Sequence, residues 1–382
     1  MPPSCSQTDP APPAETALSR TLARHPRPLG GDPARNAQAL VSLSGMVLNN
    51  SADGVQHLAQ KKKPAWLRAK APGGPEFRDT KANVEAHGLH TVCQEASCPN
   101  IGECWARGVA TIMILGDTCT RNCGFCNIKT GKPPVTDLDE PRRVAESLRG
   151  TAFKHLVITS VDRDDLPDGG AAIWAETITR VKEACPDLSL EVLIGDFKGD
   201  ADALQLVIDA KPDIIAHNVE TVRRCHAAVR PAARYERSIE LLKRVKAAGA
   251  VAKTGIMVGI GERPDEVREL FDDLVAMTSD HNGPRDPRDA AHAGTGRGDP
   301  VDIITIGQYL QPTRNHLPID RWVDPSEFVA MEEQGKAAGI KVVFSGPLVR
   351  SSYLADAQVD MLESGGGIST LDTLLGRNGR AG

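Results

Sequence analysis

The sequence is poor in aromatic side chains and has no long apolar run. Phenylalanine, tryptophan and tyrosine make up only 4% of its 382 residues, so leucine, isoleucine and valine must fill most of the core that a hydrophobic content of 40% allows. No apolar stretch approaches the roughly 20 residues of a membrane-spanning helix, which predicts a soluble protein without a membrane partner. The net charge of −5 argues against a nucleic-acid partner.

Cysteine, by contrast, is concentrated in one place. Six of the nine cysteines lie between residues 93 and 126, in the patterns CxxxxCxxxxxC and CxxxCxxC; they are Cys93, Cys98, Cys104, Cys119, Cys123 and Cys126. A secreted scaffold would spread its cysteines along the chain as a disulfide framework. Clustered triplets in an enzyme-sized chain indicate metal ligands in a reducing compartment.

The number of thiolates in each triplet favours iron–sulfur clusters over structural zinc. A structural zinc ion takes four ligands, and each triplet offers three. A [4Fe–4S] cluster held by three thiolates leaves one iron open, and an open iron can bind a small molecule. The two triplets therefore predict two metal centres.

The first 60 residues differ in character from the rest. They are rich in proline, alanine and serine and show little periodicity, which predicts a disordered tail or a targeting segment. Four arginines between Arg20 and Arg35 resemble a transit peptide, but Asp9, Glu15 and Asp32 argue against one, so we favour a solvated tail. Residues 61–109 then form an extension that carries the first triplet.

From about Val109 the chain alternates between β-rich and helical segments. This alternation predicts a parallel sheet with right-handed crossovers, in an open or complete barrel. Prolines stand where three of the helices start, and glycines stand where two of them end. The predicted strands are Ala110–Leu115, His155–Thr159, Ser189–Ile194, Asp213–Ala216, Val251–Val258 and Val301–Ile306. The predicted helices are Pro141–Leu148, Ala171–Ala184, Ala201–Ala210, Tyr235–Ala248, Pro264–Met277 and Pro325–Ala338.

A polar or glycine-rich segment follows every predicted strand. The carboxyl ends of parallel strands share one face of a barrel, where active sites lie, so these segments should form a catalytic mouth. They are Cys119–Cys126, Ser160–Asp165, Gly195–Asp200, His217–Thr221, Gly259–Glu262 and Gly307–Pro312. The segment Thr278–Pro300 instead connects a helix to the next strand. We expect it to be a surface insertion on the opposite face, without a catalytic role.

The segment Thr118–Cys126, with the sequence TCTRNCGFC, resembles the signature loop of the radical S-adenosylmethionine (SAM) enzymes, and Phe125 fits the aromatic residue before their third cysteine. The resemblance implies that Cys119, Cys123 and Cys126 hold a [4Fe–4S] cluster whose open iron binds SAM. An electron from that cluster would cleave SAM and release a 5′-deoxyadenosyl radical. The implied fold is a partial (β/α)6 barrel over residues 110–345.

Four further segments, spread between about Lys63 and Asp356, resemble lipoyl synthases: Cys93–Trp105, Thr159–Gly170, Gly307–Pro312 and Arg350–Tyr353. The resemblance implies that Cys93, Cys98 and Cys104 hold an auxiliary [4Fe–4S] cluster whose fourth ligand is Ser352, so that residues 346–382 close this cluster. The reaction implied is insertion of two sulfur atoms, at C6 and C8 of a protein-bound octanoyl-lysine, with the auxiliary cluster as donor.

The same resemblance implies partners. The substrate would be an octanoylated carrier domain, such as a 2-oxoacid dehydrogenase E2 component or the glycine cleavage H protein. An electron donor such as flavodoxin or ferredoxin, and an iron–sulfur carrier for cluster repair, would also be needed. The expected location is the bacterial cytoplasm, with a mitochondrion or plastid as the alternative.

The residues that we expect to bind SAM are predicted only from their position on the catalytic mouth. Asn218, Glu220, Gly259, Gly261 and Glu262 lie where related barrels contact SAM, as does Phe125 in the signature loop. Position is an argument by analogy, so a purely structural role for each loop is the competing interpretation.

Two other functions fit parts of the pattern. Another sulfur-inserting radical SAM enzyme, similar to biotin synthase or to the methylthiotransferases, would share the second triplet, but those families place their auxiliary cysteines elsewhere. A zinc module used only for binding would use thiolates without turnover. Iron and sulfide analysis separates the zinc module from an enzyme with two [4Fe–4S] clusters, which holds about eight irons per chain.

Overall fold

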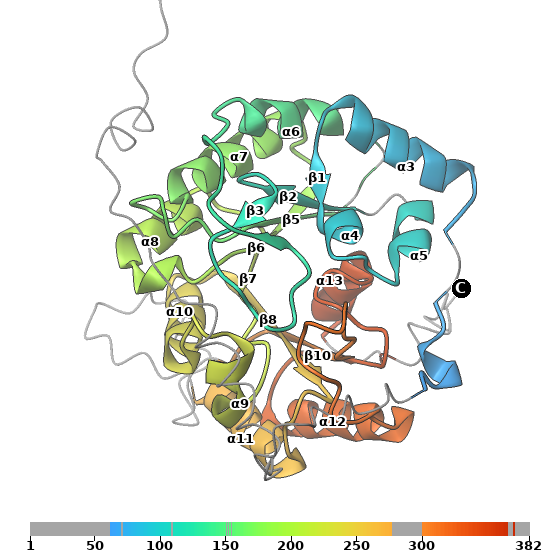
Figure 1. The fold of residues 1–382 in the computed structure, drawn as a ribbon. Helices are drawn as coiled ribbons and strands as arrows, with labels where there is room; N and C mark the ends of the chain where they lie inside the picture. Colours follow the sequence, from blue (N-terminus) through green and yellow to red (C-terminus); the bar gives the residue numbers. More distant parts are fainter. Residues whose placement is uncertain are drawn as a thin grey trace, which may run out of the picture.

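The computed structural model describes residues 62–69, 72–107, 110–149, 151, 153, 155–276, 300–365 and 370. Its centre is a sheet of eight strands in the order β1-β2-β5-β6-β7-β8-β9-β10, which curves inside an arc of helices (Figure 1). Neighbouring strands are parallel except β1 and β2, which are antiparallel. Among the described strands β1 and β10 end the order, so the barrel is partial.

The strands are short and largely buried, as in parallel sheets that are covered on both faces. A separate two-stranded pair, β3 with β4, carries the first cysteine of the signature loop. The bounds are β1 His90–Thr91, β2 Thr111–Ile114, β3 Thr118–Cys119, β4 Lys129–Thr130, β5 His155–Ser160, β6 Ser189–Leu193, β7 Ile214–Ala216, β8 Val251–Val258, β9 Ile303–Gln308 and β10 Val342–Ser345.

Helices follow the strands and cover the outer face of the sheet (Figure 1). The outer helices are α6 Glu140–Leu148, α7 Ala171–Ala184, α8 Ala201–Asp209, α9 Arg223–Val229, α10 Tyr235–Ala247, α11 Pro264–Val275 and α12 Pro325–Ala338. The extensions add α3 Pro75–Ala86, α4 Val92–Glu95, α5 Ile101–Ala106 and α13 Ala355–Glu363, and two 3-10 turns, η2 Ala65–Leu67 and η3 Phe197–Gly199.

Local sequence explains where the best-defined helix, α12, begins and ends. The side chain of Asp324 accepts the N–H of Ser326 at 2.9 Å, and Glu327 accepts the N–H of Asp324 at 3.1 Å, which is a capping box. Pro325 occupies the first turn, where its missing N–H costs nothing. Gly339, with φ of 117°, ends the helix in the left-handed conformation.

The six predicted βα units are confirmed, with the bounds of each strand and helix within two residues of the prediction. Two strands of the sheet were not predicted. β10 follows α12 as a seventh parallel strand, and β1 adds an antiparallel edge. The pattern missed β1 because it is only two residues long. It also placed Gly307 and Gln308 in a loop, whereas they belong to β9.

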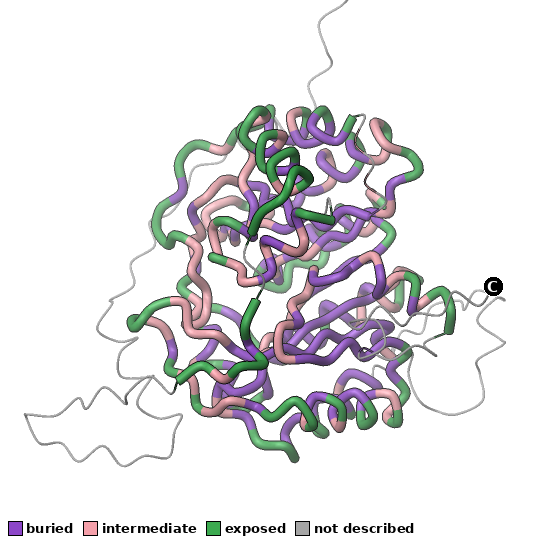
Figure 2. Tube along the Cα trace, turned by 90° about the vertical axis from the view of Figure 1, so that its right-hand side faces the viewer, coloured by how far each residue is buried: buried purple, intermediate pink, exposed green. Residues whose placement is uncertain are grey.

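Two apolar clusters lie on the two faces of the sheet, because alternate residues of a strand point to opposite faces. The larger cluster contains Ile215, Ile304 and Val343 and packs against the outer helices. The smaller cluster contains Ile214 and Ile303, which lie on the inner face of the sheet, together with residues of α13. Figure 2 shows the buried strands inside a more exposed shell of helices. The C-terminal helix therefore fills the inside of the barrel.

A buried ion pair also lies on the inner face. Lys253 of β8 and Glu191 of β6 are both 0% exposed, and the lysine Nζ donates to the carboxylate at 2.7 Å. The Nε2 of His155 lies 3.5 Å from the same carboxylate. Burial lowers the pKa of Lys253, and the carboxylate of Glu191 opposes that shift.

Two predictions fall on residues that are not described. They concern the tail of residues 1–60 and the insertion Thr278–Pro300, of which only Pro300 is described. In the described part of the chain, no helix combines the length and apolar character needed to cross a membrane.

Candidate active site

The signature loop Thr118–Cys126 lies at the carboxyl end of the sheet and is braced by backbone hydrogen bonds. The N–H of Gly124 donates to the carbonyl of Val229 at 2.9 Å, and its carbonyl accepts the N–H of Leu317 at 2.9 Å. A Cβ on Gly124 would stand 2.8 Å from the Leu317 side chain. Glycine is therefore required for this close approach, which fixes the loop against two distant segments.

The three sulfur atoms of this loop are set for an electropositive group. The Cys119 Sγ accepts the N–H groups of Arg121 and Asp162, both at 3.4 Å. Burial raises the thiol pKa of Cys123 to about 12 and that of Cys126 to about 11, and the neighbouring thiols raise both further. Thiols whose pKa is raised this far need a nearby cation to ionise, and an iron centre would supply one.

The donor set fits a cluster better than a single ion. Within the described ranges, no three Cys, His, Asp or Glu side chains converge closely enough to hold one metal ion. A [4Fe–4S] cluster is larger than one ion, so the thiolates that hold it stand further apart. The described cysteines are all free thiols.

An arginine inside the signature loop ties it to the rest of the mouth. Arg121 is 4% exposed and donates to both oxygens of Asp164 at 2.8 Å and to Asp196 at 2.6 Å. Arg237 donates to the other oxygen of Asp196 at 3.0 Å. The loops after β3, β5 and β6 are thus joined through charge-assisted bonds. We did not predict this role of Arg121, although an arginine between the cysteines and facing two aspartate-rich loops was a usable signal.

The first triplet lies in the extension before β2. The N–H of Cys98 donates to the carbonyl of Cys93 at 3.1 Å, and that of Cys104 to the carbonyl of Asn100 at 2.9 Å. Burial raises the thiol pKa of Cys93 and of Cys104, and their anionic forms repel one another. Trp105, 1% exposed, packs in the same small apolar cluster as Cys93.

The C-terminal arm, which we define as residues 346–354, brings Ser352 to this triplet. The hydroxyl of Thr111 donates to the Oγ of Ser352 at 2.8 Å. Burial raises the pKa of the Cys93 thiol, and the backbone and hydroxyl of Thr111 oppose that rise. The serine predicted as the fourth ligand and the first cysteine therefore share one neighbour.

Other contacts dock the arm on both sides. Asn218 of the mouth donates to the Oγ of Ser351 at 2.7 Å, and that hydroxyl returns a hydrogen bond to the Asn218 carbonyl oxygen at 3.0 Å. Tyr353 donates to Glu103 of the extension at 3.1 Å. The arm therefore bridges the barrel and the extension.

A buried arginine links the surroundings of the two triplets. The charge of Arg350 interacts with Cys98 of the first triplet and with Glu220 of the mouth; burial lowers the arginine pKa, and both anionic groups oppose that change. Glu220 in turn interacts with Cys126 of the second triplet.

The predicted SAM residues near β8 brace their own loop. Both carboxylate oxygens of Glu262 accept backbone N–H groups, from Gly259 at 2.8 Å and from Ile260 at 3.0 Å. Gly259 and Gly261 have φ of 82° and 117°, which glycine adopts without strain. These residues shape a tight turn at the mouth, and SAM contact by Gly259, Gly261 and Glu262 stays a prediction.

The remaining predicted SAM residues lie at the mouth as well. Glu220 has φ of 71°, an unusual value for a residue with a Cβ, and its backbone bridges to β8. Phe125 packs against the main apolar cluster. His217, by contrast, has a structural role: it bonds Ile194 and Ser238, both at 2.9 Å, and burial lowers its pKa to about 3.

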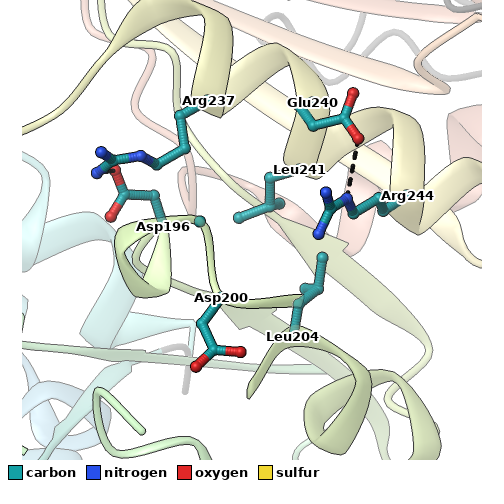
Figure 3. A pocket seen from close by; sticks show the side chains of 8 residues that line it. Asp196, Asp200, Leu204, Arg237, Glu240, Leu241 and Arg244 are labelled. Atoms are coloured by element: carbon teal, nitrogen blue, oxygen red, sulfur yellow. Dashed lines mark hydrogen bonds and ion pairs between the residues drawn. The ribbon is translucent and has the colours of Figure 1, made fainter. Parts of the chain in front are cut away.

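One cavity in the described part of the chain lies away from the cysteines, and another lies beside the first triplet, where Asn100 lies between Cys98 and Cys104 in the sequence. One, of about 30 Å³, lies beside Asp196 between α8 and α10, with Leu204 and Leu241 in its wall (Figure 3). Its volume suits a water molecule and is far too small for SAM. The other, of about 300 Å³, is lined by Trp66, Asn100 and residues of the C-terminal arm.

Comparisons with known proteins found similar sequences and similar folds. The profile of the radical SAM superfamily matches residues 113–274. A lipoyl synthase from Parabacteroides distasonis is 49% identical over 304 residues, which cover 80% of this chain and 99% of the relative. A lipoyl synthase from Nitratidesulfovibrio vulgaris (strain Hildenborough) is 50% identical over 299 residues, covering 78% of this chain and 93% of the relative. Among solved structures, methylornithine synthase is similar with a TM-score of 0.42 and 14% identity, covering 69% of this chain and 85% of that protein.

Proposed function

The chain belongs to the lipoyl synthase family of radical SAM enzymes, and on that premise we propose how its residues divide the work. Its reaction is the radical SAM-dependent insertion of two sulfur atoms, at C6 and C8 of a protein-bound octanoyl-lysine. Cys119, Cys123 and Cys126 hold the cluster that binds SAM. Cys93, Cys98 and Cys104 hold the auxiliary cluster, and Ser352 is its fourth ligand.

When bound, the two clusters and SAM supply the electron, the radical and the sulfur of the reaction. The protein supplies placement and exclusion of water, since an unactivated C–H bond offers no acidic proton to a general base. The braced signature loop and the Arg121 network keep the first set of thiolates fixed. The extension of residues 61–109 and the C-terminal segment 346–382 keep the second set at the same mouth.

One observation carries the proposal. The hydroxyl of Thr111 donates to Ser352 at 2.8 Å, and the same residue opposes the rise in the thiol pKa of Cys93, which is 259 positions from that serine in the sequence. A serine oxygen is a weaker match for iron than a thiolate, so it is released more easily. A releasable fourth ligand suits a cluster that gives up its sulfur.

The partners follow from the reaction. The acyl substrate is carried by a lipoyl-carrier protein, and we propose a 2-oxoacid dehydrogenase E2 component or the glycine cleavage H protein. Flavodoxin or ferredoxin would deliver electrons, and an iron–sulfur carrier would rebuild the auxiliary cluster. The bacterial curated relatives support a cytoplasmic location. Asn218, Glu220, Gly259, Gly261, Glu262 and Phe125 are the proposed SAM contacts.

The test is mass spectrometry of an octanoylated carrier after anaerobic incubation with SAM and the reduced protein. We expect the mass of the dithiolane product from the parent protein. Ser352→Ala should lose that product while it still cleaves SAM, because the first cluster is untouched. Ser364→Ala, a matched change at the end of α13, should behave like the parent. Loss of SAM cleavage in Ser352→Ala would contradict the assignment of the two clusters.

A further inference from the structure

Thr111 is not one of the proposed cluster ligands, but it lies beside them. It begins β2, is 4% exposed, and belongs to neither cysteine triplet. Its hydroxyl donates to the Oγ of Ser352 at 2.8 Å. β1, which ends at Thr91, pairs antiparallel with β2, and Thr111 opposes the rise in the Cys93 thiol pKa that burial causes. One strand residue thus bonds Ser352 and acts on the thiol of Cys93, two proposed ligands from opposite ends of the chain.

A second anchor holds the neighbouring serine. Asn218 and Ser351 exchange two hydrogen bonds, of 2.7 and 3.0 Å, so the serine hydroxyl both accepts and donates. Gly255 of β8 leaves room for this pair: a Cβ there would stand 2.8 Å from the Asn218 oxygen and 3.1 Å from the Ser351 oxygen. Residues of three separate segments thus fit closely around the hydrogen bonds between the Asn218 amide and the Ser351 hydroxyl, which indicates a specific contact.

We propose that Thr111 and Asn218 are positioning residues that hold Ser352 at the auxiliary cluster. The proposal rests on the proposed role of Ser352 as a ligand. A single serine on a connecting segment ligates well only when its oxygen is already in place, because ordering the segment otherwise opposes binding. Thr111 fixes the oxygen itself, and Asn218 fixes the residue before it.

Iron retention measures this role without turnover. The full-length chain with Cys119, Cys123 and Cys126 changed to alanine retains only the auxiliary ligand set, so its iron reports on that cluster alone. After anaerobic reconstitution, the protein is mixed with an iron chelator and the loss of cluster absorbance is followed. Thr111→Val keeps the shape of the side chain and removes the hydroxyl, whereas Thr111→Ser keeps the hydroxyl.

We expect Thr111→Val to release iron about fivefold faster than the parent. This ratio of rates corresponds to the loss of one hydrogen bond that contributes about 1 kcal/mol. Thr111→Ser should remain within about twofold of the parent. In a Ser352→Ala background, Thr111→Val should add nothing, because its partner is gone. Equal rates for Thr111→Val and the parent, with faster release from Ser352→Ala, would overturn the role of Thr111.

Ser351→Ala tests the second anchor. It is also the alternative variant for the iron-release measurement if Thr111→Val does not load a cluster. It removes the partner of Asn218 and leaves Thr111 and Ser352 in place, and we expect faster iron release of similar size. A parent-like rate would overturn the role of Asn218. If Ser352→Ala itself retained iron as well as the parent, the ligand assignment would fail, and that result is distinct from failure of the anchors.

Discussion

Replacement of Gly307 by alanine should separate the two halves of the reaction. Gly307 lies in β9 directly beneath the C-terminal arm, and a Cβ there would stand 2.0 Å from the carbonyl oxygen of Val349 and 3.0 Å from the Arg350 guanidinium. Ordinary contact begins at 3.4 Å, so the oxygen must move by about 1.4 Å. Ser352 is three residues further along the same arm and would move with it.

The size of the effect follows from that displacement. A misplacement of about 1 Å at a reacting centre costs roughly a hundredfold in rate. We therefore expect lipoyl formation by Gly307→Ala to fall about a hundredfold. SAM cleavage should stay within about threefold of the parent, because the signature loop is held by Val229, Leu317 and the Arg121 network rather than by the arm.

The assay measures both products in one reaction, lipoylated carrier and 5′-deoxyadenosine. Gly131→Ala is the matched control, because its new Cβ would lie 3.6 Å from the Thr118 side chain, an ordinary contact, although it too adjoins a cysteine loop. It should leave both products unchanged. Parent-like lipoyl formation by Gly307→Ala would refute the argument that the arm sets the position of Ser352.

Three further predictions concern stability and the insertion. Lys253→Met removes the lysine partner of the buried Glu191 carboxylate and leaves only the His155 ring, 3.5 Å away, beside it, so it should destabilise the fold by about 3–5 kcal/mol, and adding Glu191→Leu should recover most of the loss in thermal unfolding. Asp302→Asn should lower the unfolding midpoint at pH 7, because two lysines lie 2.8 Å from the carboxylate. The folded-state pKa of Asp302 is below its usual 3.8, so its contribution is present above that pH and the difference between the two proteins should shrink in more acidic solution. Replacing Thr278–Pro300 by a short glycine–serine linker should leave turnover intact, since the backbone of Val301 already bonds that of Leu274 at 3.2 Å; a large loss of lipoyl product would contradict this.

Local pattern was enough to predict the barrel. Alternation of apolar and helical segments, with proline at helix starts and Gly339 at a helix end, acts over a few residues and leaves a clear signal. The spacing of the cysteines likewise identified two sets of thiols. A helix or a cysteine motif depends mainly on neighbours in the sequence, so both were visible before the structure.

The contacts that complete the site were not visible in the pattern. Thr111 meets Ser352 across 241 positions, and Asn218 meets Ser351 across 133. No periodicity marks such a pair, because its members belong to elements that approach only after the sheet has formed. Asn218 was expected at SAM from its place on the mouth, and its hydrogen bonds to Ser351 could not be foreseen from that place. The role of Ser352 came from resemblance to a family, and the structure added the neighbours that hold it.

The hydrogen bonds that hold the two sets of proposed ligands differ in strength. This difference agrees with the role proposed for each set. The signature loop is fixed by Arg121, whose buried bonds to Asp164 and Asp196 join opposite charges and contribute about 1.5–3 kcal/mol each. At Ser351 and Ser352 the bonds join neutral hydroxyl and amide groups, each contributing about 1 kcal/mol. A ligand set that must survive every turnover needs the first kind of support. A serine that must leave iron when sulfur is withdrawn needs the second, because stronger bonds would hold the arm in place after the cluster had changed.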